Sequence, residues 1–204
     1  GVEKVTDQVG PEVDAAIAAT TDSDYEAVHG VTPTTQAALL MQRYIHEYGV
    51  SRESFSAFPL ISHANGANNK FAMFQRAIKA SVYERAGLIS SPLNVFDIAP
   101  DADGAAAMIL AKPDLLPSGV PYQQVQIIGS SVTSDTLSLH DRPDPLDFRA
   151  VRLSVERASY QAGILPDQID FFELDDAFSI YAALSLEAAG FAPKGQAVNL
   201  ASGG

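Results

Sequence analysis

The chain has 204 residues, of which 47% are hydrophobic and 19% are charged, and this composition is typical of a globular protein with a buried core. Its formal net charge of −12 argues against nucleic acid as a partner, because binding a phosphate backbone needs clustered Lys and Arg. These residues include no cysteine, which excludes disulfides, thiolate metal sites and a cysteine nucleophile among them. Because no run approaches about 20 apolar residues and the first ten residues do not resemble a leader, we expect a cytoplasmic protein without a membrane partner.

The first predicted elements are the end of a strand at residues 1–6 and a helix from Pro33 to Tyr48. Thr32 is a good N-cap for this helix, and proline suits its first position. Gly49 is a suitable residue to end it. The sequence therefore predicts both ends of this helix.

The next part of the chain mixes helix and turn signals. Apolar residues recur at helical spacing over residues 51–61, although Pro59 predicts a kink or weakens the helix. Residues 62–70 are rich in Asn and Gly and are expected to form a loop. Residues 79–86 fit either one short helix or an extended linker.

Buried strands are expected at residues 93–97 and 105–110, with a loop at 100–104 between them. A Pro-rich linker at 113–121 is the best candidate for an internal boundary. A further strand is expected at residues 125–131.

A helix is predicted from Asp144 to Gly163. Asp144 can cap it, Pro145 suits the first position, and Asp147 lies near the positive end of the helix dipole.

The last predicted elements are a strand at 169–174, a helix at 177–189 and a final strand at 198–204. Strands that alternate with helices in this way are typical of a layered α/β fold.

Four stretches have, in this order and spacing, the pattern of one protein family. They are residues 1–6, residues 92–97 with 103–107, residues 160–163 with 166–170, and residues 172–179. Together they resemble the thiolase superfamily, and specifically its sterol-carrier-protein-2-like branch.

The resemblance implies a thiolase-like layered αβα fold, of which this chain carries a part. Residues 1–112 would form the rear of the N-terminal half, with a loop region at about residues 7–90. Residues 122–204 would form the front of the C-terminal half, and 113–121 would link the two.

The resemblance also implies a function, as part of an acetyl-CoA acetyltransferase that acts on coenzyme A (CoA) thioesters by acyl transfer. Acyl-CoA would be the substrate, with no covalently bound cofactor. The chain is then expected to be an internal piece, inactive alone, without the cysteine-bearing helix and the Gly-His-Pro segment. The alternative is a thiolase-like subunit without thiolysis activity. It would be a lyase or aldolase on CoA thioesters, or a scaffold for an OB-fold and zinc-ribbon partner; a homo-oligomer also stays open.

Asp175 stands where the family has Asn or His, whose side chain helps to hold the thioester oxygen. An ionised Asp cannot donate a hydrogen bond to developing negative charge. The resemblance therefore implies that Asp175 is protonated, or is a base, or belongs to different chemistry. The plain alternative is a carboxylate that caps the helix starting near residue 177, with Asp176 beside it.

The loop at residues 97–104 is implied to approach the pantetheine arm of CoA, because glycine there permits close backbone approach. An ordinary turn is the plain alternative. The residues implied in CoA binding are His63, Asp97, Ala99, Pro100, Gly104 and Phe178. Lys70, Arg76 and Lys79 are candidates for the CoA phosphates. No metal is expected, because the four histidines lack ligand spacing.

Overall fold

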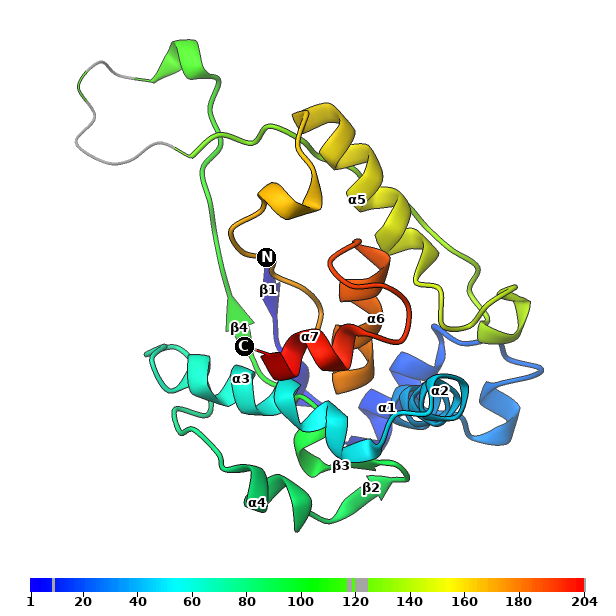
Figure 1. Cartoon of the computed structure of the whole chain (residues 1–204). Helices are drawn as coiled ribbons and strands as arrows, with labels where there is room; N and C mark the ends of the chain where they lie inside the picture. Colours follow the sequence, from blue (N-terminus) through cyan, green and yellow to red (C-terminus); the bar gives the residue numbers. More distant parts are fainter. Residues whose placement is uncertain (9, 117–118, 120–124, 204) are drawn as a thin grey trace.

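The computed structural model describes residues 1–8, 10–116, 119 and 125–203 (Figure 1). This part of the chain forms α-helices and two small antiparallel sheets, in which β1 pairs with β4 and β2 pairs with β3. The helices are α1 (Gly10–Ala18), α2 (Pro33–Tyr48), α3 (Ala57–Gly66), α4 (Ala80–Glu84), α5 (Arg149–Ala162), α6 (Ser179–Ala188) and α7 (Ala197–Gly203). The strands are β1 (Val2–Glu3), β2 (Leu88–Ser90), β3 (Leu93–Asn94) and β4 (Gly104–Ala105). None of the described helices is both long and apolar enough to cross a membrane.

The core lies where α2 packs against α6, with α7 and α3 beside them (Figure 1). Both helices contribute small and large apolar side chains that are almost fully buried. They include Ala37, Leu40, Met41 and Tyr44 from α2, and Ile180, Ala183 and Leu184 from α6. The predicted helix at 177–189 is confirmed as α6, and it starts two residues later than expected.

The prediction for α2 is confirmed at both ends. The Thr32 hydroxyl accepts a hydrogen bond from the Thr35 N–H at 3.3 Å, and the Thr32 N–H donates to the Thr35 hydroxyl at 2.7 Å. This reciprocal pair satisfies two backbone groups at the helix start. At the other end Gly49 has φ 66°, a left-handed conformation that glycine adopts without a Cβ penalty.

The predicted loop at residues 62–70 is wrong in its first half, because α3 continues to Gly66. A 3-10 turn at Arg52–Ser56 precedes α3, so Pro59 lies in the first turn of the helix rather than in its middle. The first N–H groups of a helix have no partner inside it, so proline costs little there. Residues 80–84 form α4, so the helix is the correct alternative for that segment.

The predicted strand at 93–97 ends early, at Asn94. The Asn94 side chain accepts a hydrogen bond from the Phe96 N–H at 2.8 Å, and this turns the backbone into a 3-10 turn at Val95–Asp97. Asn side chains compete with strand pairing in this way. The turn points Asp97 back into the protein.

The strands expected at 125–131 and 169–174 are not formed among the described residues, and the one at 105–110 is reduced to β4. The segment at 105–110 is also not buried as expected, since Ile109 is 98% exposed, and Val125 in the segment at 125–131 is 91% exposed. Apolar alternation predicts which side chains share a face, but a strand forms only when another backbone lies beside it. Of the predicted linker, Pro113–Leu115 is a 3-10 turn, and residues 117–118 and 120–121 lie outside the described residues.

The predicted helix at 144–163 starts at Arg149, four residues after Pro145, its expected first position. Asp144 accepts a hydrogen bond from the Leu146 N–H at 3.0 Å, so it closes a turn instead of capping the helix. The end at Gly163 is confirmed, with φ 69°. At the end of the chain, α7 replaces the strand expected at 198–204.

Candidate functional site

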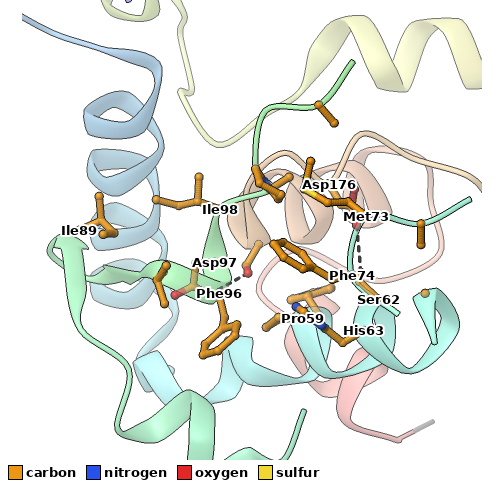
Figure 2. A pocket seen from close by; sticks show the side chains of 18 of the residues that line it. Pro59, Ser62, His63, Met73, Phe74, Ile89, Phe96, Asp97, Ile98 and Asp176 are labelled. Carbon is orange, nitrogen blue, oxygen red and sulfur yellow. Dashed lines mark hydrogen bonds between the residues drawn. The ribbon is translucent and has the colours of Figure 1, made fainter. Parts of the chain in front are cut away.

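A pocket of about 840 Å³ lies between α3, the segment 72–74, the segment 95–102 and the start of α6 (Figure 2). Its volume is in the range of small-molecule sites. Most of its walls are apolar. Large apolar side chains on these walls include Phe58, Met73, Phe74, Ile89, Phe96 and Ile98.

Backbone pairing joins the two sides of this pocket. Ile98 forms an antiparallel bridge with Phe178, and the Ala99 N–H donates to the Ala177 carbonyl at 2.9 Å. The two segments are about 80 residues apart in the sequence. This pairing brings the loop at 97–104, which follows the quoted stretch 92–97, beside the quoted motif at 172–179.

Asp97 is the centre of a buried hydrogen-bond network at the edge of the pocket, and it is only 1% exposed. Its Oδ1 accepts from the Ser179 hydroxyl at 2.7 Å and from the Tyr83 hydroxyl at 3.0 Å. Its Oδ2 accepts from the Asn94 N–H at 2.9 Å. Hydrogen bonds to this one carboxylate therefore link α4, the turn after β3 and the start of α6.

Burial raises the pKa of the Asp97 carboxyl above its usual value, because the charged form loses hydration. Hydrogen bonds from Asn94, Ser179 and Tyr83, with the charge of Arg52, act in the opposite direction. The same burial, together with the Asp97 charge, raises the pKa of the Tyr83 hydroxyl. At neutral pH Tyr83 is thus a donor to the carboxylate.

The two adjacent acids of the motif have different positions. Asp176 lines the pocket, and its Oδ2 accepts from the Ser62 hydroxyl of α3 at 3.0 Å (Figure 2). Asp175 is exposed and is not among the lining residues, and its Oδ1 accepts from the Ala177 N–H at 3.0 Å. Asp175 therefore closes a turn before α6 and does not cap the helix, whose N-cap is Phe178 and has no side-chain cap hydrogen bond. Asp176 is the carboxylate that lines the pocket.

His63 lies on the α3 wall of the pocket (Figure 2). Its ring stacks on Phe74 with 6.0 Å between centroids and meets the edge of Phe96 at 5.8 Å. Its Nδ1 is 3.1 Å from the carbonyl oxygen of Arg76. These contacts hold the segment 72–76 against α3.

The structure brings together four of the residues implied in CoA binding, because His63, Asp97, Ala99 and Pro100 all line the pocket. Phe178 is 7% exposed and packs in the core behind it. Gly104 lies in β4, opposite Glu3, and is not a lining residue.

Sequence reasoning missed other lining residues, among them Phe74, Asp176 and Ser179. Ser179 belongs to the quoted motif at 172–179, so its place in that motif was the available signal. Phe74 follows a segment read as a loop, and only its aromatic character marked it. Neither signal indicates which side chains meet in space.

Neither Lys nor Arg lines the pocket in the described part of the chain. The candidate phosphate ligands Lys70, Arg76 and Lys79 are exposed and lie on the segment that includes the wall at 72–74. Among the described residues, no group of three or more His, Cys, Asp or Glu could hold a metal ion. A second pocket of about 480 Å³ adjoins the first and shares Ser62 and Asp176 with it.

Comparison with known proteins identifies the class to which this fold and this site belong. Residues 131–204 match the family described as "Thiolase C-terminal domain-like". This match and the relatives described below confirm the resemblance of the four stretches to the thiolase superfamily.

Two archaeal relatives are named acetyl-CoA acetyltransferase. The protein of Methanocaldococcus jannaschii is 33% identical over 198 residues, which are 97% of this chain and 50% of the relative. The protein of Methanothermobacter thermautotrophicus is 35% identical over 196 residues, which are 96% of this chain and 50% of the relative. The chain thus spans about half the length of these relatives.

The fold is similar to that of a solved structure titled "Ltp2-ChsH2(DUF35) aldolase". The TM-score is 0.77 at 22% sequence identity, over 94% of this chain and 50% of that one. This similarity confirms the thiolase-like α/β fold class, of which this chain carries a part.

Proposed function

We propose that this chain contributes the CoA-thioester pocket of a thiolase-type acetyl-CoA acetyltransferase. The observation that carries the proposal is the pairing of Ile98 with Phe178, which brings two family motifs to one apolar pocket of about 840 Å³. The names of the two archaeal relatives support this activity.

The charges around the pocket suggest how a CoA thioester lies in it. Asp97 and Asp176 line the pocket, so the phosphates of CoA are disfavoured inside. Lys70, Arg76 and Lys79 are exposed next to one wall and would attract them there. The apolar walls would then hold the thioester end and its pantetheine arm, with His63, Ala99 and Pro100 around it.

The covalent route of acyl transfer requires a nucleophile. A cysteine thiolate attacks the thioester carbonyl, the C–S bond to CoA breaks, CoA leaves as a thiolate, and the acyl group stays on the enzyme. Residues 1–204 include no cysteine. We therefore propose that the attacking cysteine comes from outside these residues.

The two carboxylates favour a second candidate function, cleavage of a β-hydroxyacyl-CoA by a lyase or aldolase. Such a reaction begins when a base takes the proton of the hydroxyl group, and Asp176 in the pocket or Asp175 next to it is a suitable residue type. The solved structure of similar fold is titled as an aldolase with a DUF35 component. In this alternative the chain would work with a partner of OB-fold and zinc-ribbon type.

The division of the chain is part of the same proposal. Residues 1–112 would belong to one half of the fold and residues 122–204 to the other, with 113–121 between them. The family match that starts at residue 131 supports this division.

An acetyl-labelling experiment separates the two functions. The protein purified from its own cells is incubated with radiolabelled acetyl-CoA, digested and mapped by mass spectrometry. Acyl transfer predicts a labelled cysteine in a peptide outside residues 1–204, and loss of the label when free CoA is added. A label on residues 1–204 would reject the acyltransferase. Absence of any acetyl-enzyme, together with cleavage of a β-hydroxyacyl-CoA in a parallel incubation, would reject it as well and favour the lyase.

A further inference from the structure

Ser179 lies in the pocket wall, and its hydroxyl proton is donated to a hydrogen bond within the protein. The residue is 4% exposed, is the first residue of α6 and lines the pocket. Its hydroxyl donates to Asp97 Oδ1 at 2.7 Å, a length typical of a charge-assisted hydrogen bond.

The surroundings of Asp97 fix the direction of this hydrogen bond. An ionised carboxylate is an acceptor only, and the other groups on it, the Tyr83 hydroxyl and the Asn94 N–H, both donate. The backbone N–H of Asn94 can only donate a hydrogen bond, so Asp97 Oδ2 must accept it. The Ser179 hydroxyl has one proton and two lone pairs, so its lone pairs are left for any group in the pocket.

We propose that Ser179 is a specificity-determining residue of this pocket, a hydrogen-bond acceptor fixed by Asp97 that binds an N–H or O–H donor of the ligand. It cannot donate to a carbonyl or phosphate oxygen while its proton points to Asp97. Asp97 is the positioning residue, because it sets the orientation of Ser179 and its own oxygens are already occupied by donors of the protein.

The identity of the donor rests on the proposed function. The pantetheine arm of CoA has two secondary amides, and each has one N–H group. We assign one of these N–H groups to Ser179, since the pocket is apolar elsewhere and a buried amide without a partner is costly.

The test compares pantetheine with its two mono-N-methylated forms by calorimetry. In the wild-type protein, methylation of the amide that contacts Ser179 should weaken binding about tenfold, the loss of one hydrogen bond. In Ser179→Ala the same methylation should change the affinity less than about twofold, because the acceptor is gone. Ser185→Ala is the matched control, a buried serine of α6 that does not line the pocket, and it should behave as the wild type.

Two further variants separate the orientation of Ser179 from general stability. In Asp97→Asn the amide oxygen should turn to the Asn94 N–H, so its NH₂ group faces Ser179 and the hydroxyl proton turns into the pocket. The preference for the N–H form of pantetheine should then disappear. Tyr83→Phe removes another donor to Asp97 but leaves Ser179 in place, so the preference should remain.

Each outcome has a distinct meaning. Equal losses on methylation in the wild type and in Ser179→Ala, or no loss with either methylated form, overturn the role of Ser179 while the proposed function stands. If the wild-type protein binds none of the three compounds, the proposed CoA pocket is overturned together with it.

Discussion

At the scale of single residues, the Tyr83 hydroxyl gives the network around Asp97 one of its donors. Tyr83 is fully buried, and its hydroxyl lies 3.0 Å and 3.1 Å from the two carboxylate oxygens. A hydrogen bond to a charged group contributes about 1.5–3 kcal/mol, so Tyr83→Phe should lower the free energy of unfolding by about that amount. Urea denaturation followed by circular dichroism measures this change in the free energy of unfolding.

Tyr160→Phe, at a tyrosine that is 90% exposed, is the control and should change stability by less than about 0.5 kcal/mol. Equal effects of the two variants would contradict the network.

The raised pKa of Asp97 predicts a pH dependence of stability with a definite sign. Between the usual Asp pKa of about 3.9 and the raised folded value, the folded protein binds the proton more strongly than the unfolded chain. The contribution of Asp97 to stability therefore increases as the pH falls through this window. The groups that face it are Tyr83, Arg52, Asn94 and Ser179.

Asp97→Asn tests this sign, because asparagine does not titrate. At pH 7 the variant should be about 1–3 kcal/mol less stable than the wild type, since hydrogen bonds to a neutral amide replace the stronger ones to a carboxylate. The difference in unfolding free energy should grow as the pH is lowered from 7 toward 4. A difference that shrinks over this range would mean that the pKa of Asp97 is lowered in the folded protein.

The motif around Asp175 and Asp176 indicates how far sequence reasoning reaches at this scale. The family resemblance implied that Asp175 lies at the site and that the loop starting at Asp97 approaches the pantetheine arm. It could not tell which of two adjacent acids turns into the pocket, because that depends on the turn that Asp175 closes with the Ala177 N–H. It also could not find the Asp97 network, because Tyr83 and Ser179 are 14 and 82 residues away from Asp97 along the chain.

At the scale of elements, the segment around Gly129 packs closely on α5. The Ser130 N–H donates to the Gln161 side chain at 3.0 Å, and a Cβ at residue 129 would overlap the carbonyl oxygen of Ala158. Gly129→Ala should therefore destabilise the protein by about 1–3 kcal/mol, because backbone must shift to admit the methyl group. Thermal unfolding measures the change.

Gly87→Ala is the matched control, since a Cβ there meets nothing within 4 Å. It should leave the unfolding temperature nearly unchanged. If Gly129→Ala were equally harmless, the contact between this segment and α5 would be disproved.

Local signals predicted the helices better than the strands. Thr32 and Gly49 act through neighbours a few residues away, so the sequence alone was enough to predict α2 at both ends. The strands expected at 125–131 and 169–174 depend on a second backbone, which no local pattern encodes. Pro59 was misleading, because a proline disrupts a helix only beyond its first turn. The sequence did not show that the 3-10 turn ends at Ser56 and that α3 begins only at Ala57.

At the scale of the whole molecule, much apolar surface lies outside the α2–α6 core. Met108, Ile109 and Leu110 are between 69% and 98% exposed, and they belong to the extended chain that leads away from β4 (Figure 1). The predicted thiolase-like α/β fold class is confirmed by the family match and the similar solved structure, although the described residues form only two small sheets. The position of the pocket was predictable only through the family motifs, because its two sides come from segments about 80 residues apart.

Hydrogen–deuterium exchange with and without acetyl-CoA is the most direct measurement of whether this pocket binds a CoA thioester. We predict slower exchange on binding in α3, residues 72–74 and residues 95–102, with α5 unchanged as an internal reference. Phe74→Ala should weaken this protection, and Phe71→Ala, at an 84% exposed residue that does not line the pocket, should not. Protection confined to other parts of the chain, or none at saturating acetyl-CoA, would contradict the proposed pocket.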